Sequence, residues 1–168
     1  MTKMLEPMIN EIQQEAVITR TVLERVPADK LGWRPHPKSM SLGQLALHVA
    51  SIPGVLSTVA QLEQFDVATA NFNPPEPKDA NEILTTLDAG VKAAKEYLGG
   101  LSESTATADW RMISKGREVF TIPRVAMLRS ILLNHWYHHR GQLSVYLRLL
   151  DVPVPVIYGR SADENPFA

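Results

Sequence analysis

"NHWYHHRGQLSVYLRLL", residues Asn134 to Leu150, places three of the five histidines of this chain within five consecutive positions. Read in steps of three and four residues, one face of this segment, extended upstream to residue 128, consists of Leu128, Leu132, His135, His139, Gln142, Leu143 and Tyr146. This spacing is that of an amphipathic helix, and Pro123 upstream suits the first turn of one. We therefore expect a helix from Pro123 to Leu150 that directs this face inward.

Three further segments have helical periodicity. They run from Met4 to about Val26, from Ser41 to about Phe65, and from a cap at Asp79 or Asn81 to Gly99 and Gly100. Ser41 and Gln44 have the spacing of a capping box, which marks the start of the second helix. Pro53 and Gly54 inside that helix predict a kink or an early break.

The segment from Ser102 to Ile122 has no helical period, and we expect a short hairpin or an irregular crossover there, with a turn at Lys115 and Gly116. Four long helices without internal repeats predict an all-α fold, a four-helix bundle. The 168 residues are about the number that one domain needs, so we expect a single domain over residues 1–168.

The charge balance and the composition narrow the functional classes. The chain has 17 Lys and Arg against 18 Asp and Glu, so no global field favours nucleic acid or an anionic membrane. It has no cysteine, which excludes disulfides, thiolate metal ligands and a cysteine nucleophile. The N-terminal segment is interrupted by Glu6, Glu11 and Glu15, without a signal-peptide core, so a cytoplasmic protein is expected.

The histidines on the inward face indicate a metal site. His135 and His139 lie one helical turn apart, a spacing that lets two imidazoles bind one ion. His48 is a polar residue on the apolar face of the second helix and is the candidate third ligand. The alternative for His48 alone is a core histidine bonded to a backbone carbonyl. Three such ligands would leave positions on the metal for water or substrate.

Four more residues are candidates for the surroundings of this site. Gln142 lies one turn from His139, and Gln44 lies one turn from His48, although its capping role competes. His138 borders the histidine face or faces a partner subunit. Arg140 could bind a substrate carboxylate, with a solvated ion pair as the alternative. The sequence offers no Asp or Glu near the histidine faces as a general base.

Three segments together resemble the DinB/YfiT-like family of metal-dependent proteins: LGQLALHVA around His48, the Asn134–Leu150 segment, and the tail VPVPVIYGRSADE. The resemblance implies an up-down-down-up bundle and a divalent metal, nickel or zinc, held by His48, His135 and His139. It also implies homodimers. Members with assigned activity are thiol-dependent transferases or isomerases that join low-molecular-weight thiols to electrophiles.

The sequence leaves three functions open. The first is a metal-dependent enzyme, a thiol transferase or a hydrolase, which activates a thiol cosubstrate or water toward a small electrophile. Because the chain lacks cysteine, such a thiol must be a cosubstrate. The second is a non-catalytic metal-binding or stress-response protein, and the third is a metal-free bundle that acts through its dimer surface.

Overall fold

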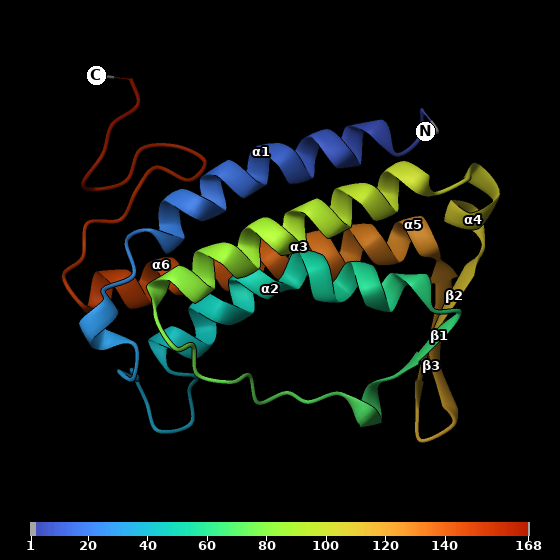
Figure 1. Ribbon diagram of the computed structural model, residues 1–168, viewed down its shortest axis with the longest axis horizontal. Coiled ribbons are helices and arrows are strands. Elements are labelled where there is room, and N and C mark those ends of the chain that lie inside the picture. Colours follow the sequence, from blue (N-terminus) through green and yellow to red (C-terminus); the bar gives the residue numbers. More distant parts are fainter. Residues whose placement is uncertain (1–2, 168) are drawn as a thin grey trace.

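A computed structural model describes residues 3–167, and most of them are helical (Figure 1). The long helices are α1 (Glu6–Leu23), α2 (Leu42–Gln61), α3 (Ala80–Gly100) and α6 (Asn134–Leu149), and α6 continues α5 (Arg124–Met127) through a π-helical segment, Leu128–Leu133. In Figure 1 the chain runs one way along α1, the opposite way along α2 and α3, and back from α5 to α6. A short helix, α4 (Glu103–Thr107), follows α3.

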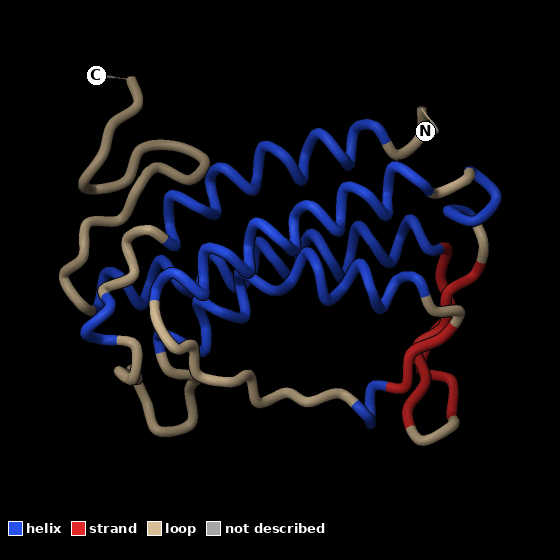
Figure 2. The backbone as a smooth tube through the Cα atoms, viewed as in Figure 1, coloured by secondary structure: helices blue, strands red, loops and turns tan. Residues whose placement is uncertain are grey.

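A small sheet lies at one end of these helices (Figure 2). Its strands are β1 (Gln64–Asp66), β2 (Asp109–Ser114) and β3 (Arg117–Pro123), with β1 parallel and β3 antiparallel to the central β2. The predicted turn joins β2 to β3, with Lys115 and Gly116 at positive φ. The expectation of an all-α bundle is therefore correct for the greater part, and of the two predicted alternatives, a hairpin or an irregular crossover, the hairpin is present as β2 and β3; the expectation omitted β1, which completes the sheet.

Local sequence signals explain where the helices begin. The Ser41 side chain accepts from the Gln44 backbone N–H, and the Gln44 side chain accepts from Ser41, so the predicted capping box is present. Asp79, rather than Asn81, caps α3. In α1, Pro7 lies in the first turn, where its missing N–H costs no helical hydrogen bond.

Helix α2 ends at Gln61, four residues earlier than expected, because side chains satisfy its last carbonyls. Trp110 donates to Val59, Tyr97 donates to Ala60, and Arg124 donates to Ala60 and Leu62. Free carbonyls at a buried helix end would be costly. The chain can therefore leave the helix there, and residues Gln64–Asp66 pair with β2 instead of extending α2.

Helix α2 is the central element of the core. Its buried residues include Leu42, Leu45, Val49 and Ile52. By length and composition alone α2 is apolar enough to cross a membrane. Most of the helix is buried inside the protein, however, as in a core helix. Its apolar character thus reflects packing against α3 and α6.

Helix α2 continues through Pro53, so of the two predicted alternatives, a kink or an early break, the break does not occur. The close approach of α3 explains Gly54. A Cβ on Gly54 would lie 2.9 Å from Gly90 Cα, and a Cβ on Gly90 would lie 3.1 Å from the Gly54 nitrogen. Only glycine allows two helix backbones to come this close. Gly54 and Gly90 therefore allow α2 and α3 to pack at this short distance.

We expect Gly54→Ala to destabilise the protein. The new methyl group meets backbone rather than a movable side chain, and such overpacking costs about 1–3 kcal/mol. The gain in helix propensity, at most ~1 kcal/mol, does not offset this. The control is Gly99→Ala in α3, whose Cβ would meet nothing within 4 Å. Urea unfolding measures both; equal stability of the two variants would contradict the close-packing argument.

Candidate metal centre

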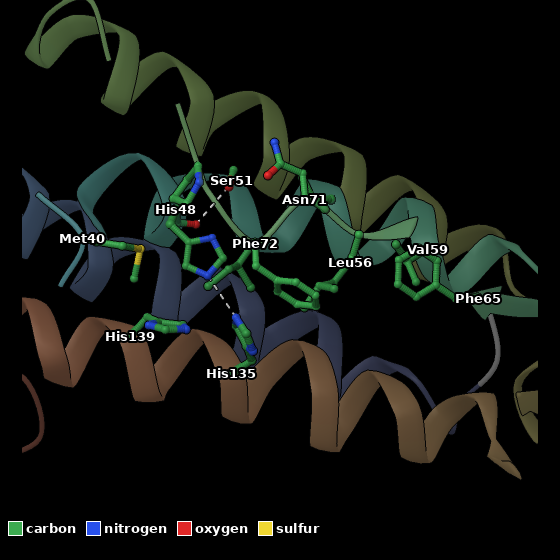
Figure 3. Close-up of a pocket in the computed structure, with 14 residues that line it drawn as sticks. Met40, His48, Ser51, Leu56, Val59, Phe65, Asn71, Phe72, His135 and His139 are labelled. Atoms are coloured by element: carbon green, nitrogen blue, oxygen red, sulfur yellow. Dashed lines mark hydrogen bonds between the residues drawn. The ribbon is translucent and has the colours of Figure 1, made fainter. Parts of the chain in front are cut away.

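Three half-buried histidines from two helices converge between α2 and α6 (Figure 3). His48 lies on α2, and His135 and His139 lie one turn apart on α6. One ligand atom from each ring lies within 4.8 Å of the other two. The structure thus brings together the three residues that the sequence singled out as ligands.

The geometry of the cluster suits one ion. His48 Nε2 and His135 Nε2 are 3.0 Å apart. The ring centroids of His48 and His135 are 5.2 Å apart, and His139 lies 4.5 Å from each. Nitrogens bound at about 2.0–2.1 Å to one zinc ion lie roughly 3–3.4 Å from one another. Small side-chain rotations therefore suffice to close all three rings on an ion.

Gln142 fixes the tautomer of His139. Its side-chain oxygen lies 2.9 Å from His139 Nδ1. Because an amide oxygen only accepts, Nδ1–H must be the donor, which leaves the Nε2 lone pair free for a ligand. Orientation of a ligating imidazole through its other nitrogen is the usual arrangement at metal sites. The predicted placement of Gln142 beside His139 is confirmed.

The three histidines are held in their neutral form. Burial, followed by the neighbouring rings of His139 and His135, lowers the pKa of His48 to about 4. Burial, with His139 and His138 nearby, lowers the pKa of His135 to about 4 as well. Burial also lowers the pKa of His139, although its bond to Gln142 opposes the shift. Neutral imidazoles at pH 7 are the form that binds metals.

A pocket of about 330 Å³ opens beside the cluster. The three histidines lie at one end, and Val59 and Phe65 lie at the other, with Leu56 and Phe72 between them (Figure 3). The lining residues, all in the described part of the chain, include no Asp or Glu. No carboxylate side chain therefore contributes to the described lining of this pocket.

Gln44 and His138 do not join the cluster. The Gln44 side chain is used in the capping box and donates to the Pro74 carbonyl at 2.9 Å, so the prediction that it supports His48 is wrong. His138 is exposed, and its ring lies 4.8 Å from that of His139 without lining the pocket. It is a neighbour of the site on the solvent side.

Arg140 points away from the pocket: the predicted ion pair is present, but it is buried rather than solvated, and the alternative of a substrate-binding residue is not supported for this pocket. Its side chain is only 1% exposed and forms an ion pair with Glu15 of α1 at 2.6 Å. It also donates to Thr19 and to Tyr158, and the Tyr158 hydroxyl donates to Glu15. Arg140 therefore joins α1, α6 and the C-terminal tail, and it is neither a substrate-binding residue nor a solvated one.

Sequence reasoning missed several residues of the pocket wall. Phe65 comes from β1, where the second helix was expected to end, and Asn71 and Phe72 come from the loop before α3, where the sequence contains no periodic pattern. Only contacts across the fold bring this loop to the α2 face. On α2 itself, the spacing of Ile52, Val55, Leu56 and Val59 was a usable signal, because these positions continue the face of His48.

Comparisons with known proteins agree with this geometry. The model of the DinB family matches residues 1–165. The chain belongs to the DinB family. The uncharacterized protein YrdA of Bacillus subtilis is 25% identical to it over 166 residues, which cover 98% of this chain and 93% of that protein. The resemblance inferred from the three sequence segments is thereby confirmed.

Solved DinB-like structures share the fold of this DinB protein. A DinB-like protein from Bacillus cereus has a TM-score of 0.64 and 26% identity, over 86% of this chain and 91% of that one. YjoA, a DinB-like protein from Bacillus subtilis, has a TM-score of 0.68 and 18% identity, over 93% and 100% of the two chains. The latter shows similarity of fold alone.

We expect the metal-free protein to lose stability on acidification. The unfolded chain binds protons on its histidines below about pH 6.5, whereas folded His48 and His135, with a pKa of about 4, do not. Between these values the unfolded state holds more protons, so the free energy of unfolding falls as pH falls. Urea unfolding in chelator at pH 7, 6 and 5 measures this slope.

The same titration of two variants assigns the slope to the cluster. His48→Gln should flatten it, and His36→Gln, on the exposed loop before α2, should leave the contribution of the cluster in place. An unchanged slope in His48→Gln would contradict the assignment.

Proposed function

We propose that this DinB protein is a metal-dependent enzyme that acts on a small electrophilic molecule, as a thiol transferase or a hydrolase. The observation that carries the proposal is the convergence of His48, His135 and His139 at one end of a pocket of about 330 Å³. This volume lies at the lower end of the range of small-molecule sites, roughly 300–1,000 Å³. A site that served only to store an ion would not need such a chamber.

The donor set fits a divalent transition metal. Three neutral imidazoles suit nickel or zinc, and the proposed cofactor is one of these. Such ligands do not reduce the charge of the ion, and the described residues that line the pocket provide no carboxylate to do so. When bound, the ion supplies Lewis acidity, which lowers the pKa of a coordinated thiol or water.

The residues of the chain supply the rest of the site. Gln142 holds His139 Nδ1–H and so directs the other ring nitrogen to the cluster. The apolar side chains along α2 exclude bulk water from the chamber, which strengthens electrostatic interactions there. Because the chain contains no cysteine, the thiol of a transferase reaction must come from a low-molecular-weight cosubstrate.

The proposal also covers the helix arrangement, the cellular location and the partners of this protein. We infer an up-down-down-up bundle that forms one domain over residues 1–168, and a cytoplasmic homodimer that binds neither nucleic acid nor membrane. The net charge of -1 supports the absence of a nucleic-acid partner. Light scattering coupled to gel filtration measures the oligomeric state.

Metal content is the first test of this proposal. Untagged protein reconstituted with nickel or zinc should hold about one ion per chain. His48→Ala and His139→Ala should lose it, because each removes one of three ligands, whereas His138→Ala, on the neighbouring exposed histidine, should retain it. Elemental analysis after gel filtration measures this. A wild type without metal after reconstitution would refute the proposed function.

The second test is the catalytic activity of the same wild-type and variant proteins. The loaded wild type should accelerate the loss of a low-molecular-weight thiol in the presence of an electrophile, and His139→Ala should not. Thiol reagents report on the cosubstrate alone, because the protein has no cysteine of its own. Release of acid from an activated ester without thiol would favour the hydrolase over the transferase.

Gln142 should tune metal affinity. Gln142→Leu removes the acceptor for His139 Nδ1–H, and the loss of such an outer partner typically weakens metal binding by about 10–100-fold. Gln142→Glu keeps an acceptor and should retain the affinity. Competition titration with a chromogenic chelator measures both. Equal affinity of the Leu variant and the wild type would show that Gln142 does not position the ligand.

A second candidate is a non-catalytic metal-binding or stress-response protein. The observation that favours it is the absence of a carboxylate from the described residues of the pocket, because many metal-dependent hydrolases use one as general base. This candidate predicts bound metal without turnover of any thiol, ester or electrophile.

A further inference from the structure

The pocket has one continuous apolar wall. Ile52, Val55, Leu56 and Val59 follow His48 along one face of α2. From His48 to Val55 is seven residues, or about 10 Å along the helix. Phe65 and Phe72, from β1 and from the loop before α3, also line the chamber (Figure 3). A molecule whose reacting group lies at the histidines would therefore extend along this wall.

The described residues of the lining include no charged side chain, and its few polar groups are largely engaged elsewhere. The Ser51 hydroxyl donates to the His48 carbonyl at 3.0 Å. The Asn71 side-chain oxygen accepts from the Asn73 backbone N–H at 2.9 Å. A charged group that lies along this wall, away from the histidines, would lose hydration without gaining a counter-ion from the protein, which is costly.

We propose that the site takes an uncharged substrate with an apolar, aromatic or aliphatic body. Its coordinating or electrophilic head lies at the three histidines, and its body lies along α2 between Val55 and Phe72. This inference rests on the proposed function and names the substrate class of that site. In a transferase reaction the wall along α2 holds the body of the electrophile, because a carboxylate carried by the thiol would find no counter-ion among the described residues of that wall.

Phe72 and Val55 make the mouth of the chamber apolar. Phe72 is 78% exposed and Val55 is 55% exposed, although both contribute to the lining. Large apolar side chains left open beside a pocket are typical of a surface that a ligand covers. An apolar body that reaches the mouth would bury both.

A set of imidazoles that share one head tests this inference. 4-Phenylimidazole has an apolar ring where 4-methylimidazole has a methyl group. Two further compounds have a sulfonate or a trimethylammonium group at the para position of the phenyl ring, and each of these charged groups binds metal poorly. Binding of 4-phenylimidazole should be about tenfold or more tighter than that of 4-methylimidazole, because the ring leaves water. Either charge should weaken the binding of the phenyl compound by about tenfold. Calorimetry measures affinity, and amide shifts locate the ligand.

Charge variants at the mouth provide the matched control. Val55→Lys should tighten binding of the sulfonate and weaken binding of the trimethylammonium compound, since Val55 lines the chamber. Val119→Lys, at a valine of similar exposure on β3, should change neither. Both sites are exposed, so neither substitution removes core packing.

The outcome is separable from that of the proposed function. All ligands are titrated into metal-loaded and metal-free protein, so the preference for an apolar body is measured with and without the ion. Loss of metal binding would refute the enzyme proposal, while a retained preference in the metal-free form would still support the apolar chamber. Equal binding of the methyl and phenyl compounds, tight binding of either charged compound, or no binding in both forms would overturn the inference.

Discussion

The packing of α2 is the constraint on which the rest of the structure depends. This helix is buried against α3 and α6, and its approach to α3 is set by the contact of Gly54 with Gly90. Its ends are fixed by the capping box at Ser41 and by side chains that reach its last carbonyls. A helix held in this way can place one polar side chain, His48, at a defined depth. The cost of burying that imidazole is lowered because it stays neutral.

Helix α6 has two faces with different polar residues. One face presents His135 and His139 to α2 and the pocket. The other presents Arg140 to Glu15 of α1, a pair that is almost entirely buried. A buried ion pair is stabilised only when its remaining polar atoms are satisfied, and here Thr19 and Tyr158 complete it. Charge is thus concentrated between α1 and α6, and the histidine face remains free of it. A π-helical segment, Leu128–Leu133, lies immediately before these two faces.

The sequence predicted those parts of the fold that local rules control. Helix starts followed from Ser41 and Asp79, and the hairpin turn followed from Lys115 and Gly116. The three histidines were found because spacing on a helix determines which side chains share a face. The burial of Arg140 and the strand at Gln64–Asp66 were missed, because each depends on a partner distant in sequence: Glu15 for the arginine and β2 for the strand. The wall formed by Phe72 was missed for the same reason.

The distribution of charge around the histidines limits the chemistry that this site can perform. With three neutral ligands and no ionised residue among the described lining, a bound divalent ion would be the dominant charge in the chamber. Any negative charge that develops during a reaction would then be stabilised by the ion alone. The wall along α2 adds affinity through apolar contact and adds no polar recognition of a particular functional group. Under the proposed function, specificity would arise from the shape of the chamber and from the group at the metal, a combination suited to a range of apolar electrophiles rather than to one polar metabolite.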